Sequence, residues 1–361
     1  MGLIVQIEKQ IGEFHLNLDV QTQARRIGIL GPSGCGKSMT LKCIAGILSP
    51  DKGRIAADNH VFYDSDTRKN QKVQMRKVGY LFQNYALFPN MTVEENIMAG
   101  LKFPKREKRK VAQSFIEKFH LEGFASRLPH QLSGGQQQRT ALARILASEP
   151  DIILLDEPFS ALDTHLKEQL QLELEFLLSD YPGIVVMVSH SRDEIFRFSE
   201  ELIVLDGGKQ AEYGRTKELF LHPSSMQAAR LTGCKNISRI EKTGEREVFA
   251  KDWNMTLQTN ELVTEEMNYI GIRAHDIMKI NGEKSTQTTV ETIDKKENVF
   301  KMQIIHTTEL PFEMQYLLKN TVTDNETQLW WKIAKPQALS PAACQTTVNV
   351  CFPKEKLILL K

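Results

Sequence analysis

At 361 residues the chain is longer than one hydrophobic core usually supports, so we expect two domains. Its 46 basic and 45 acidic residues leave a net charge of +1, which argues against nucleic acid as a partner and against direct binding to an anionic membrane surface. The 5 cysteines fall into no metal-ligand spacing, and their odd number argues against a disulfide framework, so a reducing cytoplasm is expected.

We expect neither a signal peptide nor a membrane span. Residues 1–20 alternate apolar and polar side chains, as half-buried strands do, and lack a basic start followed by an apolar run. The sequence also has no uninterrupted apolar run of about 18 residues, the length that a spanning helix needs. Any association with a membrane is therefore expected to be through a partner subunit.

Residues 3–7 and 14–20 are predicted to form antiparallel strands. ATP-binding proteins often place an aromatic ring in this part of the chain to stack on adenine. Here Ile11 and Gly12 stand where an aromatic-glycine pair is sought, and Phe14 is the nearest ring. Burial in the core explains Phe14 at least as well as adenine stacking does, because phenylalanine is usually buried.

Residues 31–38 match the phosphate-binding loop pattern G-x-x-x-x-G-K-[ST]. A buried strand is predicted over 25–30, and apolar residues over 41–48 have the spacing of a helix packed by one face. Strand, loop and helix in this order point the helix N-terminus at an anion. Lys37 is expected to reach the outer phosphates and Ser38 to bind Mg²⁺. The residues assigned to nucleotide binding here are Gly31, Pro32, Ser33, Gly34, Cys35, Gly36, Lys37, Ser38 and Met39.

A turn at 49–53 precedes a predicted strand over 54–63, and a short apolar strand over 76–82 leads to Gln83. A glutamine at this place is either a solvated loop residue or a ligand of Mg²⁺ that senses the γ-phosphate. Residues 93–128 are predicted to be helical.

The segment 132–136, Leu-Ser-Gly-Gly-Gln, precedes another predicted helix. Ser133 caps this helix, and Gly134 and Gly135 leave its first N–H groups open to an anion. An ordinary capped helix start is the alternative interpretation.

Two later strands are predicted to end in polar side chains. The apolar strand 152–155 is followed by Asp156 and Glu157, which after a phosphate-binding loop are expected to hold the Mg²⁺ shell and to polarise water, respectively. The buried strand 185–188 leads to His190. A lone histidine at a strand end is more often structural than catalytic, but ligands of open α/β sheets bind at these strand ends.

In this order the motifs resemble the ATP-binding subunits of ABC transporters. The resemblance covers residues 1–232, and its signature segment separates this family from other phosphate-loop enzymes. It implies an α/β phosphate-loop ATPase domain of the ABC type that uses ATP and Mg²⁺. The residues that carry it are the phosphate-binding loop, Gln83, Leu132 to Gln136, Asp156-Glu157, Ser160-Ala161-Leu162-Asp163 and His190.

The resemblance also implies a role for each residue. Glu157 is the general base, His190 contacts the γ-phosphate, and Gln83 couples Mg²⁺ to the membrane partner. The implied metal ligands are Ser38, Gln83 and Asp156. The missing aromatic at Ile11 departs from the family pattern.

The family further implies a homodimer in which two chains pack head to tail around two ATP molecules. One phosphate-binding loop is a half-site, because hydrolysis needs hydrogen-bond donors on the far side of the γ-phosphate. The residues expected to contribute to nucleotide binding in this way are Ser133, Gly134, Gly135, Gln136 and Asp163.

Beyond a linking helix over 226–233, the alternating runs predict an all-β domain over 236–361. Residues 270–276 resemble a strand and turn in the C-terminal regulatory domains of importer ATPases, which are oligonucleotide-binding-like barrels. The resemblance therefore implies import, with transmembrane permease subunits as direct partners and an extracytoplasmic solute-binding protein as an indirect one. Trp330 and Trp331 are predicted to lie in the core.

The transported solute is predicted from residues 230–236, which resemble the molybdate-type importers. Molybdate or a related oxyanion is therefore expected, and a sugar, polyamine or sulfate importer is the alternative. The second domain is expected either to bind such an anion, through donors such as Lys332, Thr346 and Thr347, or only to enlarge a dimer interface.

Two other classes of function are less consistent with the sequence. An ABC protein that acts on ribosomes or DNA would need a second cassette or a basic or coiled-coil insertion. A regulatory module without catalysis would not need Lys37, Asp156 and Glu157.

Overall fold

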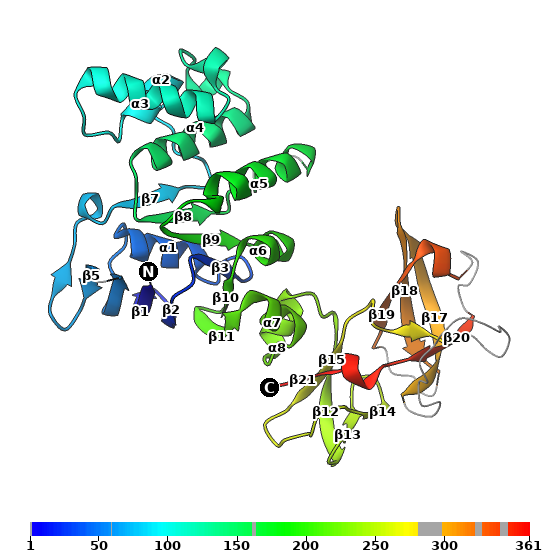
Figure 1. Ribbon diagram of the computed structural model, residues 1–361. Coiled ribbons are helices and arrows are strands. Elements are labelled where there is room, and N and C mark those ends of the chain that lie inside the picture. Colours follow the sequence, from blue (N-terminus) through cyan, green and yellow to red (C-terminus); the bar gives the residue numbers. More distant parts are fainter. Residues whose placement is uncertain (1, 59, 161–163, 281–297, 322–326, 340–345) are drawn as a thin grey trace. The chain divides into compact units, whose positions relative to one another are not determined.

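The chain forms two compact units, residues 1–218 and 219–361, and each has its own hydrophobic core. The predicted nucleotide-binding motifs lie in the first unit and the predicted β-rich region in the second. The computed structural model describes residues 2–58, 60–160, 164–280, 298–321, 327–339 and 346–361 (Figure 1).

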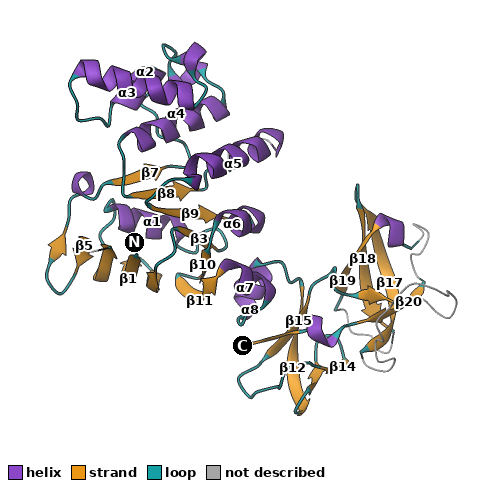
Figure 2. Ribbon diagram, viewed as in Figure 1, coloured by secondary structure: helices purple, strands orange, loops and turns teal. Residues whose placement is uncertain are grey.

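A mixed sheet of 11 strands forms the centre of the first unit, in the order β6-β5-β4-β1-β2-β11-β10-β3-β9-β8-β7 (Figure 2). Strands β10, β3, β9, β8 and β7 run parallel, whereas β6, β5, β4, β1 and β2 pair antiparallel. The predicted strands at 3–7 and 14–20 are thus confirmed. The bounds are β1 (Leu3–Ile11), β2 (Phe14–Thr22), β3 (Arg26–Leu30), β4 (Lys52–Ala57), β5 (His60–Asp64), β6 (Lys69–Asn70), β7 (Val78–Leu81), β8 (Ile152–Asp156), β9 (Ile184–Ser189), β10 (Glu201–Asp206) and β11 (Lys209–Arg215).

The parallel strands bring four motifs to one edge of the sheet. β8 and β9 are buried along their whole length, and their Ile-, Val- and Leu-rich sequences suit strands covered on both faces. Because parallel strands all end at the same edge, the residues at and after the ends of β3, β7, β8 and β9 lie together. These residues are the phosphate-binding loop, Gln83, Asp156 with Glu157, and His190.

Helices α2, α3 and α4 pack on one another, and α4 packs on the edge strand β7 (Figure 1). None of the helices within the described ranges is both long and apolar enough to cross a bilayer. The bounds are α1 (Lys37–Ala45), α2 (Val93–Met98), α3 (Lys105–Lys118), α4 (Gly134–Ala147), α5 (Thr164–Ser179), α6 (Arg192–Phe198), α7 (Thr216–Leu221) and α8 (Met226–Leu231).

Two elements that the sequence predicts as continuous are divided in the structure. The helix predicted over 93–128 is split into α2 and α3, and Pro104 stands directly before α3, where it disfavours helix in the residue that precedes it. The strand predicted over 54–63 is a hairpin of β4 and β5. Asp58, directly after β4, has a φ of 49°, a left-handed conformation that ends the strand.

A buried arginine joins this hairpin region to the helix that follows the phosphate-binding loop. The Arg76 side chain is 1% exposed and donates hydrogen bonds to the carbonyl oxygens of Cys43 and Ile44, at 2.9 and 2.8 Å. It also donates to the carbonyl of Gln71 and the side chain of Asn70. The guanidinium thereby donates to carbonyl groups in the last turn of α1, where the helix itself provides few N–H donors.

We predict that Arg76→Ala lowers the free energy of unfolding of the first unit by about 3 kcal/mol, because several buried acceptors lose a charged donor together. Urea unfolding monitored by circular dichroism measures this loss. Arg54→Ala is the matched control, since Arg54 is exposed and lies 4.0 Å from Asp64, and its loss should be about 0.5 kcal/mol or less. Equal losses in both variants would contradict the structural role of Arg76.

Beyond α8 the second unit is β-rich, as predicted, with two antiparallel sheets of five strands in the orders β14-β13-β12-β15-β21 and β16-β20-β17-β18-β19. One core cluster contains residues of both sheets. Asn236 on β12 joins the sheets, because its side chain exchanges two hydrogen bonds with the backbone of Trp330 on β19. The bounds are β12 (Asn236–Gly244), β13 (Glu247–Ala250), β14 (Met255–Gln258), β15 (Tyr269–Ile272), β16 (Met278–Lys279), β17 (Val299–Glu309), β18 (Glu313–Asn320), β19 (Leu329–Ala334), β20 (Thr347–Cys351) and β21 (Ile358–Leu360).

Candidate functional site

The phosphate-binding loop connects β3 to α1 through a tight turn. Gly34 and Gly36 have φ values of 80° and 106°, which glycine adopts without steric cost. A β-carbon at Gly31 would lie 2.4 Å from the carbonyl oxygen of Leu205, so no side chain fits there. The turn leaves backbone N–H groups at the start of α1 available to an anion.

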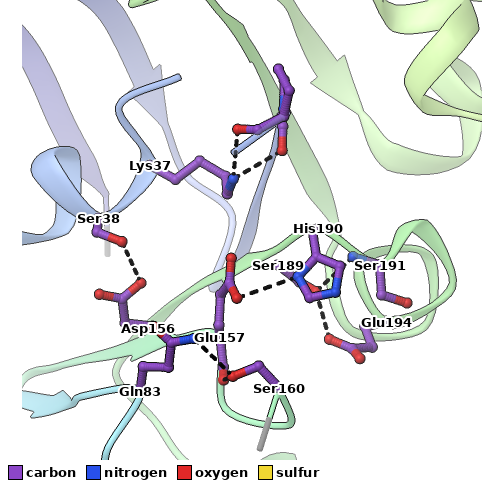
Figure 3. A network of polar contacts seen from close by, with 12 residues as sticks. Lys37, Ser38, Gln83, Asp156, Glu157, Ser160, Ser189, His190, Ser191 and Glu194 are labelled. Carbon is purple, nitrogen blue, oxygen red and sulfur yellow. Dashed lines mark hydrogen bonds and ion pairs between the residues drawn. The ribbon is translucent and has the colours of Figure 1, made fainter. Parts of the chain in front are cut away.

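Lys37 places a buried positive charge in this loop (Figure 3). Its Nζ atom donates to the carbonyl oxygens of Gly31 and Pro32, both at 2.9 Å. Within the described part of the chain, no carboxylate pairs with Lys37. The ammonium group is therefore held by dipoles alone, which suits a site that receives a phosphate.

An open cleft of about 640 Å³ adjoins the loop, a volume within the range of small-molecule sites. Its apolar part includes Ile11 and Phe14. The phenyl ring considered for adenine stacking therefore lies beside the phosphate-binding loop. The polar part of the lining includes Ser33, Lys37, Ser38, Gln83 and Glu157, and Met39 also contributes. The cleft thus joins a phosphate-binding end to an apolar end.

Asp156 ends β8 and receives a hydrogen bond on each carboxylate oxygen. Ser38 Oγ donates to Oδ1 at 2.8 Å, and Tyr80 Oη donates to Oδ2, also at 2.8 Å. Burial of the phenol and the neighbouring Asp156 raise the pKa of Tyr80, so the hydroxyl keeps its proton and remains a donor. The role of Tyr80 was not predicted from the sequence, because a tyrosine in an apolar strand has the pattern of a core residue.

Glu157 directly follows β8 and has a φ of 47°. A non-glycine residue in this left-handed region is strained, and such residues cluster at functional sites. Its Oε2 atom lies 3.3 Å from Nδ1 of His190, which follows β9 (Figure 3). The structure therefore brings together two residues that the sequence predicts separately.

Gln83 follows β7 and lines the same cleft. Its Nε2 atom lies 3.3 Å from Oγ of Ser160, and that hydroxyl donates to the carbonyl oxygen of Glu157 at 3.0 Å. The loops after β7 and β8 are thereby linked (Figure 3).

The donor set at the end of β8 fits Mg²⁺. Ser38 and Asp156 contribute a hydroxyl and a carboxylate that already lie in contact, and the amide oxygen of Gln83 is a third oxygen group on the cleft. Mg²⁺ prefers such hard oxygen ligands and typically uses one or two protein groups together with substrate phosphates. Sulfur and imidazole ligands are not needed.

A second polar network supports the loop that carries His190. The buried carboxylate of Glu194 on α6 accepts a hydrogen bond from Ser189 Oγ at 2.6 Å. It also forms an ion pair with Lys167 on α5, at 2.5 Å. Ser189 Oγ in turn accepts from the backbone N–H of Ser191 at 2.9 Å. The sequence contains no distinctive pattern for this network, because its members come from three different elements.

The signature segment does not line the cleft. Ser133 caps α4, and a capping box pairs its backbone N–H with the side chain of Gln136 at 2.9 Å. The predicted cap is confirmed, and the residues named for the far side of the γ-phosphate, Ser133, Gly134, Gly135 and Gln136, are absent from the described lining. Asp163 lies outside the described residues, as do Ala161 and Leu162.

Comparison with known proteins agrees with this geometry. The profile of the family described as "ABC transporter" matches residues 15–160. The probable sulfate/thiosulfate import ATP-binding protein CysA of Chlorella vulgaris is 39% identical over 240 residues, which are 64% of this chain and 99% of that protein. CysA of Thermosynechococcus vestitus is 34% identical over 294 residues, which are 78% of this chain and 85% of that protein.

The chain belongs to the ABC transporter family. A further relative of this ABC ATPase is the spermidine/putrescine import ATP-binding protein PotA of Nitratidesulfovibrio vulgaris, 40% identical over 61% of this chain and 60% of that protein. A solved structure, the dimeric post-hydrolysis state of the ATP-binding cassette MJ0796 bound to ADP and Pi, matches with a TM-score of 0.50 and 32% identity, over 60% of this chain and 99% of that one. The predicted ABC-type fold, ATPase class and use of ATP with Mg²⁺ are thereby confirmed.

The second unit of this ABC ATPase does not bring its predicted anion donors together. Lys332 on β19 pairs with Glu313 at 2.6 Å, and this contact, with a hydrogen bond from Gln315, lowers the pKa of the Glu313 carboxyl. Thr347 begins β20, and β17 and β18 lie between β20 and β19 in the sheet. Trp331 is fully buried, as predicted, whereas Trp330 is half-buried and stacks with the Lys235 ammonium group 4.5 Å from its ring centroid.

Proposed function

We propose that this chain is the ATP-hydrolysing subunit of an importer and that its first unit carries the chemistry. The observation that supports this most is that Lys37, Ser38 and Glu157 line one cleft at the carboxyl edge of the sheet, where Ser38 is hydrogen-bonded to Asp156. The relatives named above are import ATP-binding proteins. Residues 1–232 would form the ATP-binding domain, and residues 236–361 a regulatory domain.

In the proposed mechanism each residue acts on one part of the nucleotide or the attacking water. Lys37 and the N–H groups of the loop bind the β- and γ-phosphates, and Ser38, Gln83 and Asp156 hold Mg²⁺, which neutralises phosphate charge when bound. Glu157 takes the proton of the attacking water. The other residues of 31–39 and the signature residues 133–136 are proposed to bind nucleotide, as the sequence analysis expects.

His190 orients Glu157 and contacts the γ-phosphate in this proposal. The 3.3 Å separation of Nδ1 and Oε2 permits a hydrogen bond that fixes the carboxylate beside the cleft. At the other end of the cleft, Phe14 and Ile11 provide the apolar surface for the base. Phe14 would then take the place of the aromatic residue that is missing at Ile11.

We further propose that two copies assemble head to tail. The signature segment lies outside the cleft of its own chain, so its capped helix start is available to a second copy. The related cassette MJ0796 is described as a dimer bound to ADP and Pi. A site made by two chains places the N-terminus of α4 from one chain across the γ-phosphate bound by the other.

Transmembrane permease subunits are the proposed membrane partners, and they would place this chain at the cytoplasmic face of the membrane. An extracytoplasmic solute-binding protein would act through the permease. This assignment is supported by the importer names of the relatives and by the resemblance of the C-terminal region to importer ATPases.

The proposed solute is a sulfate-type oxyanion. Two relatives that match more than three quarters of the chain are named for sulfate and thiosulfate import, and another is named for spermidine and putrescine import. These names favour the alternatives considered in the sequence analysis over molybdate. Because the solute need not touch the ATPase subunit, its identity has to be measured on the whole transporter.

We predict that sulfate or thiosulfate raises ATP turnover of the reconstituted transporter about tenfold, since only a loaded binding protein shifts the complex toward its hydrolysing state. Turnover is measured in liposomes with sulfate, thiosulfate, spermidine and molybdate as separate additions. Stimulation by spermidine or molybdate alone would reassign the solute. A complex that hydrolyses no ATP under any of these conditions would contradict the proposed function.

A further inference from the structure

The carboxylate proposed to serve Mg²⁺ is held by a tyrosine on the neighbouring strand. Asp156 ends β8, and Tyr80 lies on β7, where its backbone pairs in register with Leu154. From this position the phenol reaches Oδ2 of Asp156 at 2.8 Å. The opposite oxygen, Oδ1, faces Ser38 Oγ at the same distance. One oxygen of the carboxylate thus contacts Ser38, which lines the cleft, and the other contacts Tyr80.

The tyrosine ring is itself fixed in place. Tyr80 stacks on Phe82, with ring centroids 4.2 Å apart and an angle of 27° between the planes. It also packs against the hydrophobic core of the first unit. A hydroxyl on a fixed ring defines a position in space, so the hydrogen bond to Asp156 sets the orientation of the carboxylate and not of the phenol.

Such orientation matters because the terminal torsion of an aspartate side chain is broad and permits many orientations of its two oxygens. A carboxylate that rotates freely loses conformational entropy when it binds a metal ion, whereas a carboxylate already held by a hydrogen bond loses less. Outer partners of this kind typically contribute about 10- to 100-fold to metal affinity or activity. The same geometry would be lost with the removal of a single oxygen atom.

We propose that Tyr80 is a positioning residue for the Mg²⁺ site, which orients Asp156 through its hydroxyl without touching nucleotide. The inference rests on the proposed function, in which Asp156 holds Mg²⁺. Tyr80 contacts Asp156 and, like Asp156, is absent from the residues that line the described cleft. Its contribution is therefore expected in metal affinity and not in nucleotide affinity.

The test is the variant Tyr80→Phe, compared with Tyr63→Phe as a matched control. Tyr63 is another tyrosine of the first unit, and its hydroxyl donates to the carbonyl oxygen of Pro50 at 2.9 Å; neither residue lines the described cleft. Both variants remove one hydroxyl and one hydrogen bond. Only Tyr80→Phe removes a partner of Asp156.

Metal binding is measured with Mn²⁺ as the probe, through the electron paramagnetic resonance signal of the free ion. The full-length chain carries Glu157→Gln to prevent turnover and is kept in excess over ATP, so that nearly all nucleotide is bound. Tyr80→Phe is expected to raise the dissociation constant for Mn²⁺ about 10- to 100-fold, while ATP affinity in EDTA stays unchanged. With Glu157 intact, the Mg²⁺ concentration for half-maximal turnover should rise in parallel, and turnover should recover at saturating Mg²⁺.

One result would contradict the role of Tyr80, and another would contradict the proposed function itself. A Mn²⁺ dissociation constant for Tyr80→Phe within about twofold of that for Tyr63→Phe would overturn the role of Tyr80 and leave the proposed function intact. If the parent protein with ATP binds no Mn²⁺ at all, the proposed function itself fails, and with it the premise of the inference.

Discussion

Replacing Glu157 by glutamine is expected to lower ATP turnover about 10²- to 10⁴-fold, the usual contribution of a general base. The amide keeps the size of the carboxylate but cannot accept the proton of the attacking water. ATP binding should change little, because the phosphate contacts belong to the loop around Lys37. Phosphate release under saturating MgATP and equilibrium ATP binding are the two measurements.

Glu149→Gln is a matched control for this variant. Glu149 also has a φ of 47°, and it is exposed, follows α4 and does not line the described cleft. It makes the same chemical change in the same backbone conformation, so it should leave turnover unchanged. A Glu157→Gln protein that retains more than about a tenth of the parent turnover would remove Glu157 from the role of general base.

The second large effect is expected in assembly. The Glu157→Gln protein should form a dimer with ATP and remain monomeric with ADP, because the interface is proposed to close on the γ-phosphate. Adding Ser133→Arg should raise the dimer dissociation constant at least about tenfold, since a long side chain at the start of α4 fills the space for that phosphate. Sedimentation velocity at several protein concentrations measures the shift.

Loss of the cap on α4 has to be separated from loss of the interface. Thr92→Arg is the control, because Thr92 caps α2 with the same capping-box geometry and should cost a similar amount of helix stability, about 1 kcal/mol. In the Glu157→Gln background this variant should still dimerise with ATP. A dimer that forms equally well with Ser133→Arg would contradict head-to-tail assembly.

The sequence was sufficient to predict that the phosphate-binding loop, Gln83 and Glu157 lie together, and the reason lies in local patterns. A phosphate-binding loop needs glycines at positions of positive φ and one lysine, so its pattern is readable within a few residues. The polar site residues Asp156, Glu157 and His190 follow apolar runs that suit a buried parallel sheet. Because such strands end at one edge, four separate motifs could be assigned to one site.

Element boundaries were predicted less well, because they depend on single backbone positions. The helix predicted over 93–128 is divided before Pro104, and the strand predicted over 54–63 turns at Asp58. Periodicity alone does not reveal a left-handed residue or a helix that restarts.

The sequence by itself determined the ATPase class and the phosphate-binding loop, whereas the tertiary structure decided what holds the neighbouring residues in place. Tyr80 is 76 positions from Asp156, and its contact depends on the register of β7 against β8. Arg76 likewise finds its acceptors on a helix more than 30 positions away. In the sequence Tyr80 is a residue of an apolar strand and Arg76 stands just before that strand. Only the packing of the strand decides which distant carboxylate or carbonyl group each of them meets.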